Sequence, residues 1–434
     1  MSTSSLTSIP RRRWRIACLL GVGVLVNYFD RVNLSVSEND LRVAFGISAI
    51  TFGYLSSAYN LTYALCQLPV GVILDKFGIR RVGRISIFLW ALASFAAAIT
   101  PTLGGLFAAR LLLGIGEAPT FPANAKAVGR WFPQSERSFA TSLFDSAAKF
   151  APAVGVPLIG VLLLKVGWRW SFAATGVITL LYLLLFNRIY RDPQDDSELT
   201  ETERAYIDQS ALAGVPETEN PAPLSVLLRQ HKVIAMVLGF GSYNYVFYLL
   251  LTWLPRYLST TLNLDLTHSF LYTGVPWLVA TFTDLLIGGL LADSLIQRGW
   301  NPSHVRKTIL IGGTTCGLGL LGAVHPASAT AALIWISIAI GGLSTAAPIG
   351  WSIPSLIAPR NSVGSVGGII NCSNQLSGIA APIVTGYLVY NLHSFAWAFG
   401  VAIIYLIVGI IAYLLLLGKI EQMPLPITSP SSAL

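Results

Sequence analysis

Hydrophobic runs long enough to cross a lipid bilayer recur along this chain of 434 residues. A transmembrane helix needs roughly 18 or more consecutive, mostly apolar residues, and such runs extend from one end of the chain to the other. Only 11% of the residues are charged, whereas a soluble domain typically carries about 25%. The sequence therefore predicts an all-α polytopic membrane protein.

Twelve spans are expected, in two groups of six that a polar stretch separates. The first six lie near 16–37, 52–74, 83–100, 103–125, 138–164 and 168–187, and the second six near 234–257, 269–292, 308–325, 329–350, 363–388 and 394–417. The predicted domains are a cytoplasmic tail (1–15), an N-terminal six-helix bundle (16–187), a cytoplasmic linker (188–233), a C-terminal six-helix bundle (234–418) and a second cytoplasmic tail (419–434). In the linker, Thr200 and Glu203 have the spacing of a capping box, which predicts a short helix.

The basic residues predict the orientation, because Lys and Arg collect at the cytoplasmic ends of membrane spans. With the N-terminus inside, most of the 28 Lys and Arg residues fall on the cytoplasmic side. The exceptions are Arg42, Lys165, Arg169 and Arg256 outside, and Arg31, Arg110 and Lys149 within spans. We expect a multi-pass protein of the inner (plasma) membrane, monomeric, with both termini cytoplasmic. The net charge of +8 then mostly reflects this topological bias, not binding to nucleic acid, and the expected partners are membrane lipid, a small organic anion and protons.

Short motifs recur between the two halves at similar offsets. Asn27-Tyr28 recurs as Asn244-Tyr245, and the segment ending in Asp75 recurs as the segment ending in Asp293. Many transporters are built from repeats and bind substrate where the repeats meet. The recurrence predicts two bundles related by a pseudo-twofold axis.

Four charged residues are expected inside the membrane in the first and fourth spans. Asp30 and Arg31 are adjacent, while Arg110 and Glu117 are seven residues apart and so share a helix face. A charge at the centre of a bilayer costs at least a few kcal/mol and usually serves a pathway. A static ion-pair cluster is the alternative, but buried pairs contribute little net stability. The pattern therefore favours a functional site.

The chemistry of these side chains predicts their roles. Arginine stays protonated and offers a planar fork that fits a carboxylate, so Arg31 and Arg110 are candidates for binding an anionic substrate. Buried carboxylates can bind and release protons near neutral pH, which makes Asp30 and Glu117 the candidates for proton coupling. Protonation of these acids would free an arginine for the substrate, so that anion and proton cross together.

The loop from Gly71 to Arg81 resembles the signature of the major facilitator superfamily between its second and third spans. That resemblance implies twelve spans in two six-helix bundles. It also implies gating roles for the charged residues of the loop and its loose repeat, namely Asp75, Arg80, Arg81 and Asp293.

Further motifs resemble the anion:cation symporter family, which includes bacterial galactonate, glucarate and hexuronate carriers. They are Asn27-Tyr-Phe-Asp30-Arg31, the run from Arg110 to Pro119, Trp131-Phe-Pro133, Thr252-Trp-Leu-Pro255 and Gly367-Gly-Ile-Ile-Asn371. Tyr63 falls where this family has a substrate-contacting tyrosine, and Tyr59 is one turn away. Tyr245, Asn371 and Asn374 are further substrate candidates from the second half, although packing within the bundle is the alternative for each.

The fifth span departs from the family pattern. Where sugar-acid carriers have Ser-Ala-Gln-Tyr, this chain has Ser146-Ala-Ala-Lys149, and Asp145 lies one turn before Lys149. Lys149 is predicted either to bind a second carboxylate of the substrate or to be neutralised in place by Asp145.

Together these features predict a secondary active transporter that imports an organic acid anion, such as a sugar acid or hydroxy acid, by proton symport with alternating access. A sodium-coupled or exchange-only carrier of a dicarboxylate or aromatic acid is the alternative; a drug exporter would lack the paired arginines. The sequence contains no catalytic, metal-ligating or cofactor-binding motif, so an enzyme is not expected.

Overall fold

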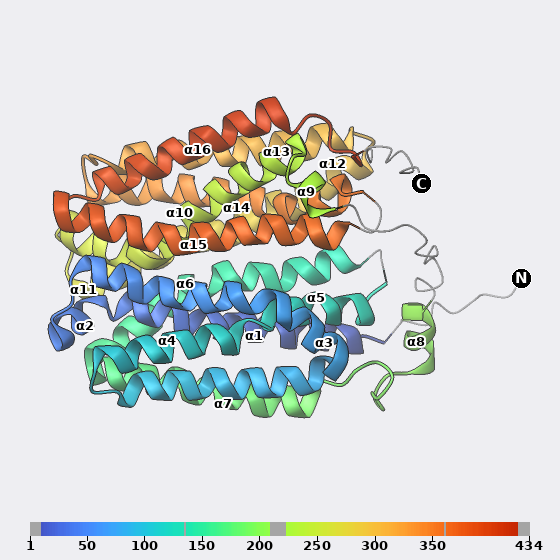
Figure 1. Ribbon diagram of the computed structural model, residues 1–434, viewed down its shortest axis with the longest axis horizontal. Helices are drawn as coiled ribbons and strands as arrows, with labels where there is room; N and C mark the ends of the chain where they lie inside the picture. The colour runs from blue at the N-terminus through green and yellow to red at the C-terminus, as the bar shows by residue number, and fades with distance from the viewer. Residues whose placement is uncertain (1–9, 134–135, 209–222, 360–361, 424–434) are drawn as a thin grey trace, which may run out of the picture. The chain divides into compact units, whose positions relative to one another are not determined.

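The computed structural model describes residues 10–133, 136–208, 223–359 and 362–423. All of the regular secondary structure in these ranges is helical (Figure 1). Within the same ranges, eight helices are long and apolar enough to cross a membrane, or nine if one bent pair forms a single span. The predicted all-α membrane fold is confirmed.

The first six predicted spans correspond to helices of the first half. These are α1 (Arg12–Val36), α3 (Ala49–Ile99), α4 (Leu103–Glu117), α5 (Thr120–Trp131), α6 (Arg137–Val166) and α7 (Trp168–Ile189), with a short α2 (Glu38–Phe45) after α1. The second and third spans are joined within α3, where Gly78 breaks the helical conformation with φ 77°. Glycine adopts this conformation without the steric cost that a Cβ imposes. The fourth span is divided at Pro119, whose lack of an N–H prevents it from continuing α4.

The second half contains the remaining predicted spans. Its elements are α10 (His231–Thr261), α11 (Leu266–Thr283), η2 (Asp284–Leu291), α12 (Ala292–Gln297), α13 (Pro302–Cys316), η3 (Gly317–Ala323), α14 (Ala329–Ile357), α15 (Val363–Leu392) and α16 (Ala396–Leu416). The eighth span passes through a π-helix, η2, which starts at the fully buried Asp284. Two short helices, α8 (Glu201–Asp208) and α9 (Leu224–Leu227), lie in the connection between the halves.

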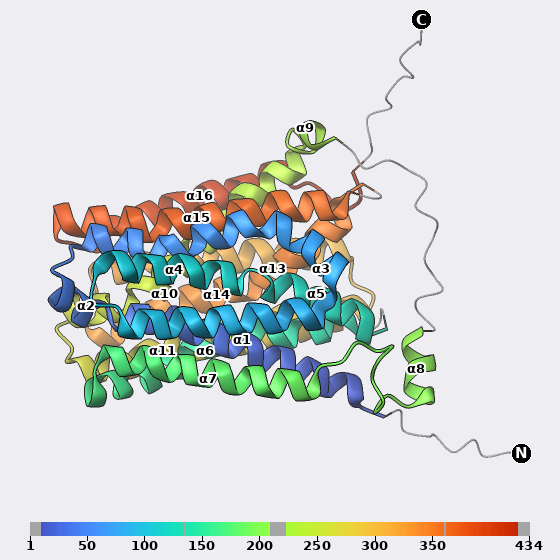
Figure 2. The same cartoon turned by 60° about the horizontal axis from the view of Figure 1, so that its bottom comes forward.

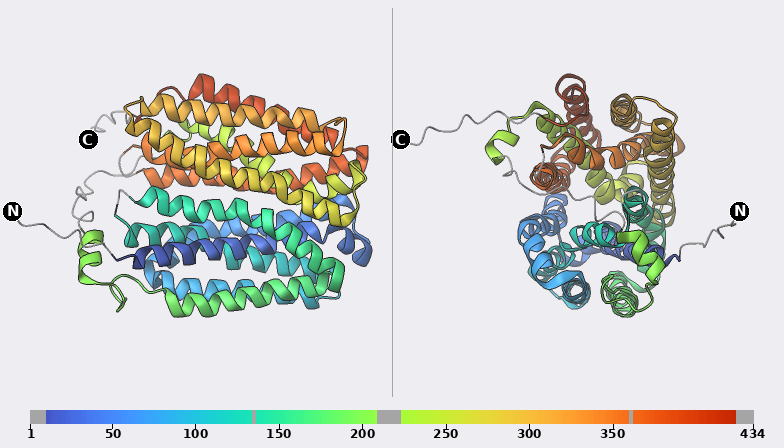
Figure 3. Two further views of the ribbon diagram at one scale, coloured as in Figure 1. Left: turned by 180° about the vertical axis from the view of Figure 1, so that it is seen from behind. Right: turned by 90° about the vertical axis from the view of Figure 1, so that its right-hand side faces the viewer.

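The chain divides into two compact units, and neither is one half of the sequence. Unit 1 consists of Met1–Val215, Leu250–Thr281 and Pro382–Ser394, and unit 2 of the remainder. In unit 1, α1 packs along α6 and α7, and α3 packs along α4 and α7. Figure 3 shows these blue-to-green helices running alongside one another. Unit 1 thus combines the first half with parts of α10, α11 and α15.

Close backbone contacts hold the α15 segment of unit 1 against α3. A Cβ added at Gly53 would lie 2.6 Å from the carbonyl oxygen of Pro382, and one added at Gly386 would lie 2.5 Å from that of Ala49. Small residues allow helices to approach this closely. The packing of α3 on α15 therefore requires glycine at both positions.

Polar contacts join the end of α1, and α2 after it, to α10 within unit 1. The Ser35 hydroxyl donates a hydrogen bond to the carbonyl of Thr252 at 2.7 Å. Glu38 and Arg256, both largely buried, form an ion pair nearby. We call these contacts, together with the α3–α15 packing, the closure contacts.

Unit 2 is built around α10, α14 and α15. A Cβ added at Gly350 of α14 would lie 2.4 Å from the ring of Phe240, so the ring of α10 packs directly on the α14 backbone. The Ser373 hydroxyl of α15 donates to the carbonyl of Val237 at 2.9 Å. Helix α14 also packs against η2, α13 and η3.

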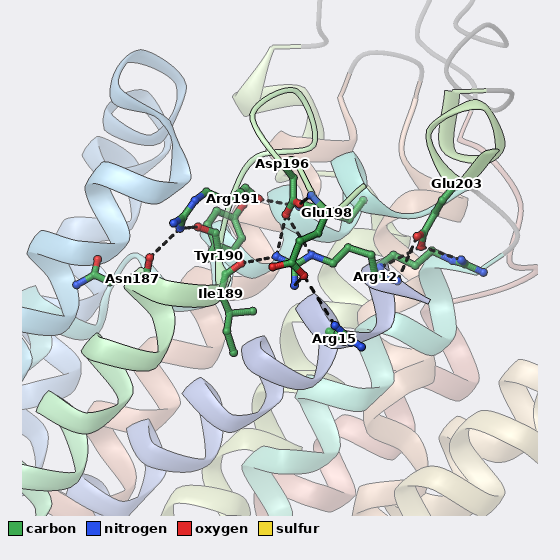
Figure 4. Close-up of polar contacts among 11 residues, drawn as sticks. Arg12, Arg15, Asn187, Ile189, Tyr190, Arg191, Asp196, Glu198 and Glu203 are labelled. Atoms are coloured by element: carbon green, nitrogen blue, oxygen red, sulfur yellow. Dashed lines mark hydrogen bonds and ion pairs between the residues drawn. The ribbon is translucent and has the colours of Figure 1, made fainter. Parts of the chain in front are cut away.

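The linker binds the N-terminal end of α1 (Figure 4). Thr200 accepts a hydrogen bond from the N–H of Glu203 at 3.3 Å, as the predicted capping box requires. The Glu203 carboxylate does not complete that box, however. It accepts hydrogen bonds from the backbone N–H groups of Arg12 (3.2 Å) and Arg13 (3.1 Å), so it caps α1 instead. A second linker residue, Asp196, pairs with the Arg12 guanidinium at 2.9 Å.

We call these interactions the linker clamp. Figure 2 shows α8 beside the start of α1. The clamp stabilises α1 because a carboxylate at a helix N-terminus satisfies unpaired N–H groups and complements the helix dipole.

Candidate functional site

An ion pair between α1 and α4 lies in the interior of unit 1. The Nε and Nη2 atoms of Arg31 each lie 3.3 Å from Oε2 of Glu117, and Nη2 also donates to Oδ1 of Asn27 at 2.8 Å. The side chains of Arg31 and Glu117 are 6% and 0% exposed. The structure thus brings together two of the four predicted intramembrane charges, on the helices that the sequence indicated.

Aromatic rings surround the Arg31 guanidinium. Its central carbon lies 4.3 Å from the ring centroid of Tyr28, 4.7 Å from that of Tyr59 and 5.6 Å from that of Tyr63. Tyr59 also lies 5.3 Å from the guanidinium of Arg110. Cation–π contacts of this kind stabilise a desolvated cation without neutralising its charge. The rings therefore help to hold the buried Arg31 cation beside Glu117.

Sequence reasoning did not identify Tyr28 as part of this site. The available signal was its position three residues before Arg31 on the same helix, which places the two side chains on one face.

The Asp30 carboxylate lies in different surroundings from Glu117. Its Oδ2 accepts a hydrogen bond from the indole N–H of Trp90 at 2.5 Å, and its Oδ1 accepts one from the Ser94 hydroxyl at 2.7 Å. Arg110, 3% exposed, lies 3.5 Å from the backbone carbonyl of Asp30. Sequence reasoning missed Trp90 and Ser94, although polar groups one turn apart in a membrane span were a possible signal. Neutral donors therefore hold the Asp30 carboxylate.

The structure pairs Lys149 with Asp145 on α6. The Nζ atom of Lys149 lies 2.5 Å from Oδ2 of Asp145, and the two side chains are 3% and 13% exposed. The i,i+4 pair predicted for the fifth span is formed.

The predicted substrate residues of the second half lie in unit 2. Tyr245 packs edge-on against Tyr405, with ring centroids 5.8 Å apart. Asn371 is half-buried, whereas Asn374 is only 2% exposed. Neither the nitrogen nor the oxygen of the Asn374 amide has a hydrogen-bond partner among the described residues. A buried polar group left without a partner costs about 1–3 kcal/mol. Substrate binding by Asn374 stays a prediction.

The structure describes only three of the four side chains predicted to act in gating. The Asp75 side chain lies outside the described part of the structure. Arg80 is half-buried, and Arg81 and Asp293 are exposed. Gly78, between Asp75 and Arg80, makes the bend in α3. Gating by these residues stays a prediction.

The helical fold, with a buried arginine paired across two membrane helices, is typical of a polytopic membrane transport protein rather than an enzyme. Residues 20–382 match the family described as Major Facilitator Superfamily, and the chain belongs to this family of transporters. The membership that the Gly71–Arg81 loop predicted is confirmed.

Relatives of known sequence match almost the whole chain. The uncharacterized transporter YybO of Bacillus subtilis (strain 168) is 37% identical, covering 98% of both chains. The probable galactarate/D-glucarate transporter GarP of Escherichia coli (strain K12) is 31% identical, covering 95% of this chain and 96% of the relative. The D-galactonate transporter of Escherichia coli O6:H1 is 30% identical, covering 95% and 97%. The resemblance to sugar-acid carriers is thus confirmed.

Solved structures of distant relatives share the fold. The crystal structure of a bacterial homologue of the human lysosomal transporter Spinster has a TM-score of 0.72 at 15% identity, covering 94% of this chain and 97% of that one. This similarity supports the twelve-span fold.

Proposed function

We propose that this protein is a secondary active transporter that imports an organic acid anion of the sugar-acid class by proton symport with alternating access. We place the protein in the inner (plasma) membrane. Both termini lie in the cytoplasm in this proposal, because Lys and Arg collect at the cytoplasmic ends of membrane spans. The names of GarP and the D-galactonate transporter support the substrate class.

The buried pair of Arg31 and Glu117 is the observation on which the proposal rests. Both of its N···O distances are 3.3 Å, whereas charge-assisted hydrogen bonds are commonly about 2.7–2.9 Å. In the proposed cycle this is the pair that exchanges partners. A substrate carboxylate would bind the Arg31 fork in place of Glu117, with the rings of Tyr59 and Tyr63 beside it.

Displacement of Glu117 couples the substrate to a proton. Once the substrate holds Arg31, a Glu117 carboxylate left unpaired in the bundle is unfavourable, and protonation removes its charge. The other charged or titratable groups near Glu117 are Asp30, Arg110 and Tyr59. The anion and one proton then enter the site together, and both leave it when the Arg31–Glu117 pair forms again.

Asp30 in unit 1 and Asn374 in unit 2 are further candidates for roles in transport. Asp30 remains a second candidate for proton binding, although its hydrogen bonds to Trp90 and Ser94 give it a positioning role as well. Asn374 would hydrogen-bond a substrate hydroxyl through the amide that has no partner among the described residues.

Transport by Glu117→Gln in proteoliposomes tests the proposal. The amide keeps the shape of the side chain but cannot carry a proton. We expect accumulation driven by an imposed pH gradient to be lost, whereas counterflow of galactonate should persist. Glu201→Gln, at an exposed position of α8, is the control and should transport as the unmodified protein does.

Two results would overturn the mechanism. One is galactonate accumulation by Glu117→Gln under a pH gradient. The other is accumulation by the unmodified protein that follows a sodium gradient and ignores the pH gradient.

A further inference from the structure

The carboxylate used by the proposed exchange, that of Glu117, lies at a break in the fourth span. Helix α4 ends at Glu117, and α5 begins at Thr120. Ala118 and Pro119, between the two helices, keep right-handed helical backbone angles. The break is therefore a gap in the ladder of backbone hydrogen bonds rather than a loop.

Two prolines cause this gap. Because proline has no N–H, Pro119 and Pro122 cannot donate to the carbonyls four residues before them. Those carbonyls belong to Ile115 and Ala118. The Gln67 side chain of α3 supplies one of the missing donors, since its Nε2 atom donates to the Ala118 carbonyl at 3.3 Å. Gln67 thus takes the place of the N–H that Pro122 lacks.

A second side chain of α3 holds the backbone on the other side of Glu117. The Ser86 hydroxyl, 5% exposed, donates to the Gly116 carbonyl at 2.5 Å. A Cβ added at Gly116 would lie 2.8 Å from the backbone nitrogen of Trp90, so α4 packs directly on α3 here. Gln67 and Ser86 come from the second and third spans, which α3 joins. Both spans therefore fix the backbone that carries Glu117.

We propose that Gln67 and Ser86 are positioning residues that hold Glu117 against Arg31 and thereby set the pH at which the transporter takes up its proton. The inference rests on the proposed function, because it takes Glu117 as the proton-binding group. Helices bend where the backbone ladder is interrupted, as it is at Pro119. Without the two donors, the break would bend further, and the Glu117 carboxylate would move away from the Arg31 guanidinium.

This movement would change the pH dependence of transport in one direction. A nearby cation favours the charged form of a carboxylate, so a weaker pair with Arg31 lets Glu117 keep its proton to higher pH. The other charged or titratable groups near Glu117 are Asp30, Arg110 and Tyr59, and none of them is substituted together with the two positioning residues. The pH of half-maximal transport should therefore rise when a positioning bond is removed.

Galactonate counterflow in proteoliposomes, measured at a series of pH values that are equal on both sides of the membrane, tests the proposal. Gln67→Met keeps the length of the side chain but removes the donor. We expect the pH of half-maximal counterflow to rise by about half a unit or more, as the loss of one hydrogen bond predicts. Ser86→Ala should shift it in the same direction. Ser142→Ala, which removes a hydroxyl bonded to the Phe139 carbonyl of its own helix, is the control and should not shift it.

Two combined variants test whether the effect runs through these bonds and through Glu117. The N–H that Pro122→Ala adds can donate to the Ala118 carbonyl, because residues 119–121 between them are helical. We expect Pro122→Ala to change the pH midpoint little by itself and to restore it when combined with Gln67→Met. In the Glu117→Gln background, Gln67→Met should leave the pH dependence of counterflow unchanged, because the amide carries no proton.

The possible contrary results separate this inference from the proposed function. A lower melting temperature for Gln67→Met with an unchanged pH midpoint would leave Gln67 only a structural role and overturn the inference alone. A shift that persists in Glu117→Gln, or that Pro122→Ala does not reverse, would do the same. Absence of galactonate counterflow in the unmodified protein, or counterflow that does not depend on pH, would overturn the proposed function and this inference with it. If Gln67→Met does not fold, Ser86→Ala decides by the same measurement.

Discussion

At the scale of single residues, adjacent side chains in α1 have different environments. Arg31 reaches the Glu117 carboxylate, while the Asp30 carboxylate is held by Trp90 and Ser94. Successive residues on a helix point about 100° apart, so neighbours in sequence reach different partners. The two acids of the site are therefore expected to respond differently to substitution.

Trp90→Phe tests the positioning of Asp30. Phenylalanine fills most of the indole volume but removes the N–H that Oδ2 of Asp30 accepts. We expect a loss of about 1–3 kcal/mol in stability, because a buried acceptor is left without its donor. Thermal unfolding of the purified protein would measure the effect. Trp170→Phe, at a position that is 69% exposed, is the matched control and should change stability little. Equal melting temperatures for the two variants would contradict this role for Trp90.

At the scale of elements, two features depend on contacts between segments far apart in sequence. The linker clamp brings residues 196–203 onto the start of α1, and the closure contacts bring parts of α10 and α15 onto α1, α2 and α3. Each uses backbone groups as well as side chains. Substitutions at these positions should therefore act on packing rather than on substrate recognition.

Gly53→Ala tests the packing of α3 on α15. A methyl group here would meet the Pro382 carbonyl at 2.6 Å, so the helices must move apart. We expect a destabilisation of about 1–3 kcal/mol, as for other overpacked sites. Gly129→Ala in α5, where an added Cβ has no neighbour within 4 Å, should be neutral or slightly stabilising. Scanning calorimetry would compare the two, and similar melting temperatures would show that the close contact is not required.

A pH dependence of stability beside the linker clamp follows from Glu136, the residue before α6, which pairs with Arg13. The Arg13 guanidinium, at 2.7 Å, lowers the pKa of Glu136 below its ordinary value of 4.5. A carboxylate with a lowered pKa stabilises the folded state above the unfolded pKa, and this contribution is lost as the pH falls through the folded value. We expect Glu136→Gln to melt at a lower temperature than the unmodified protein at pH 7, with the difference vanishing once the pH falls below the lowered pKa that Glu136 has in the folded protein. A difference that persists in acid would exclude the ion pair as its cause.

At the scale of the whole molecule, unit 1 includes segments of both halves of the sequence. On the proposed orientation, the closure contacts lie at the extracytoplasmic ends of the spans. Under the proposed alternating access, these contacts would break and form again during each cycle. The ion pair of Glu38 and Arg256 is then a determinant of the transport rate.

A charge exchange between these two residues tests that role. Glu38→Gln and Arg256→Gln should each alter the rate of galactonate counterflow, because each removes one partner of the pair. The combined variant Glu38→Arg with Arg256→Glu restores opposite charges and should recover part of the rate. Counterflow in proteoliposomes would measure all three. If the counterflow rate of the combined variant falls by more than the two single variants' losses added together, attraction between the two charges does not set the transport rate.

The sequence by itself determined the helical membrane class, the superfamily and the membrane-embedded charges. Long apolar runs in lipid allow few structures, and ionisable residues inside such runs are rare enough to be conspicuous. The pairs Asp145–Lys149 and Thr200–Glu203 were also predictable, because one helical turn separates each.

Only the tertiary structure decided which partners the buried charges take and which segments of the two halves pack together. Glu117 pairs with Arg31 and not Arg110, Trp90 and Ser94 hold Asp30, and Glu203 caps α1 rather than its own helix. These partners are separated by 60 or more residues in sequence. Helix periodicity gives the direction of a side chain on its own helix, whereas the packing of other helices sets what that side chain meets.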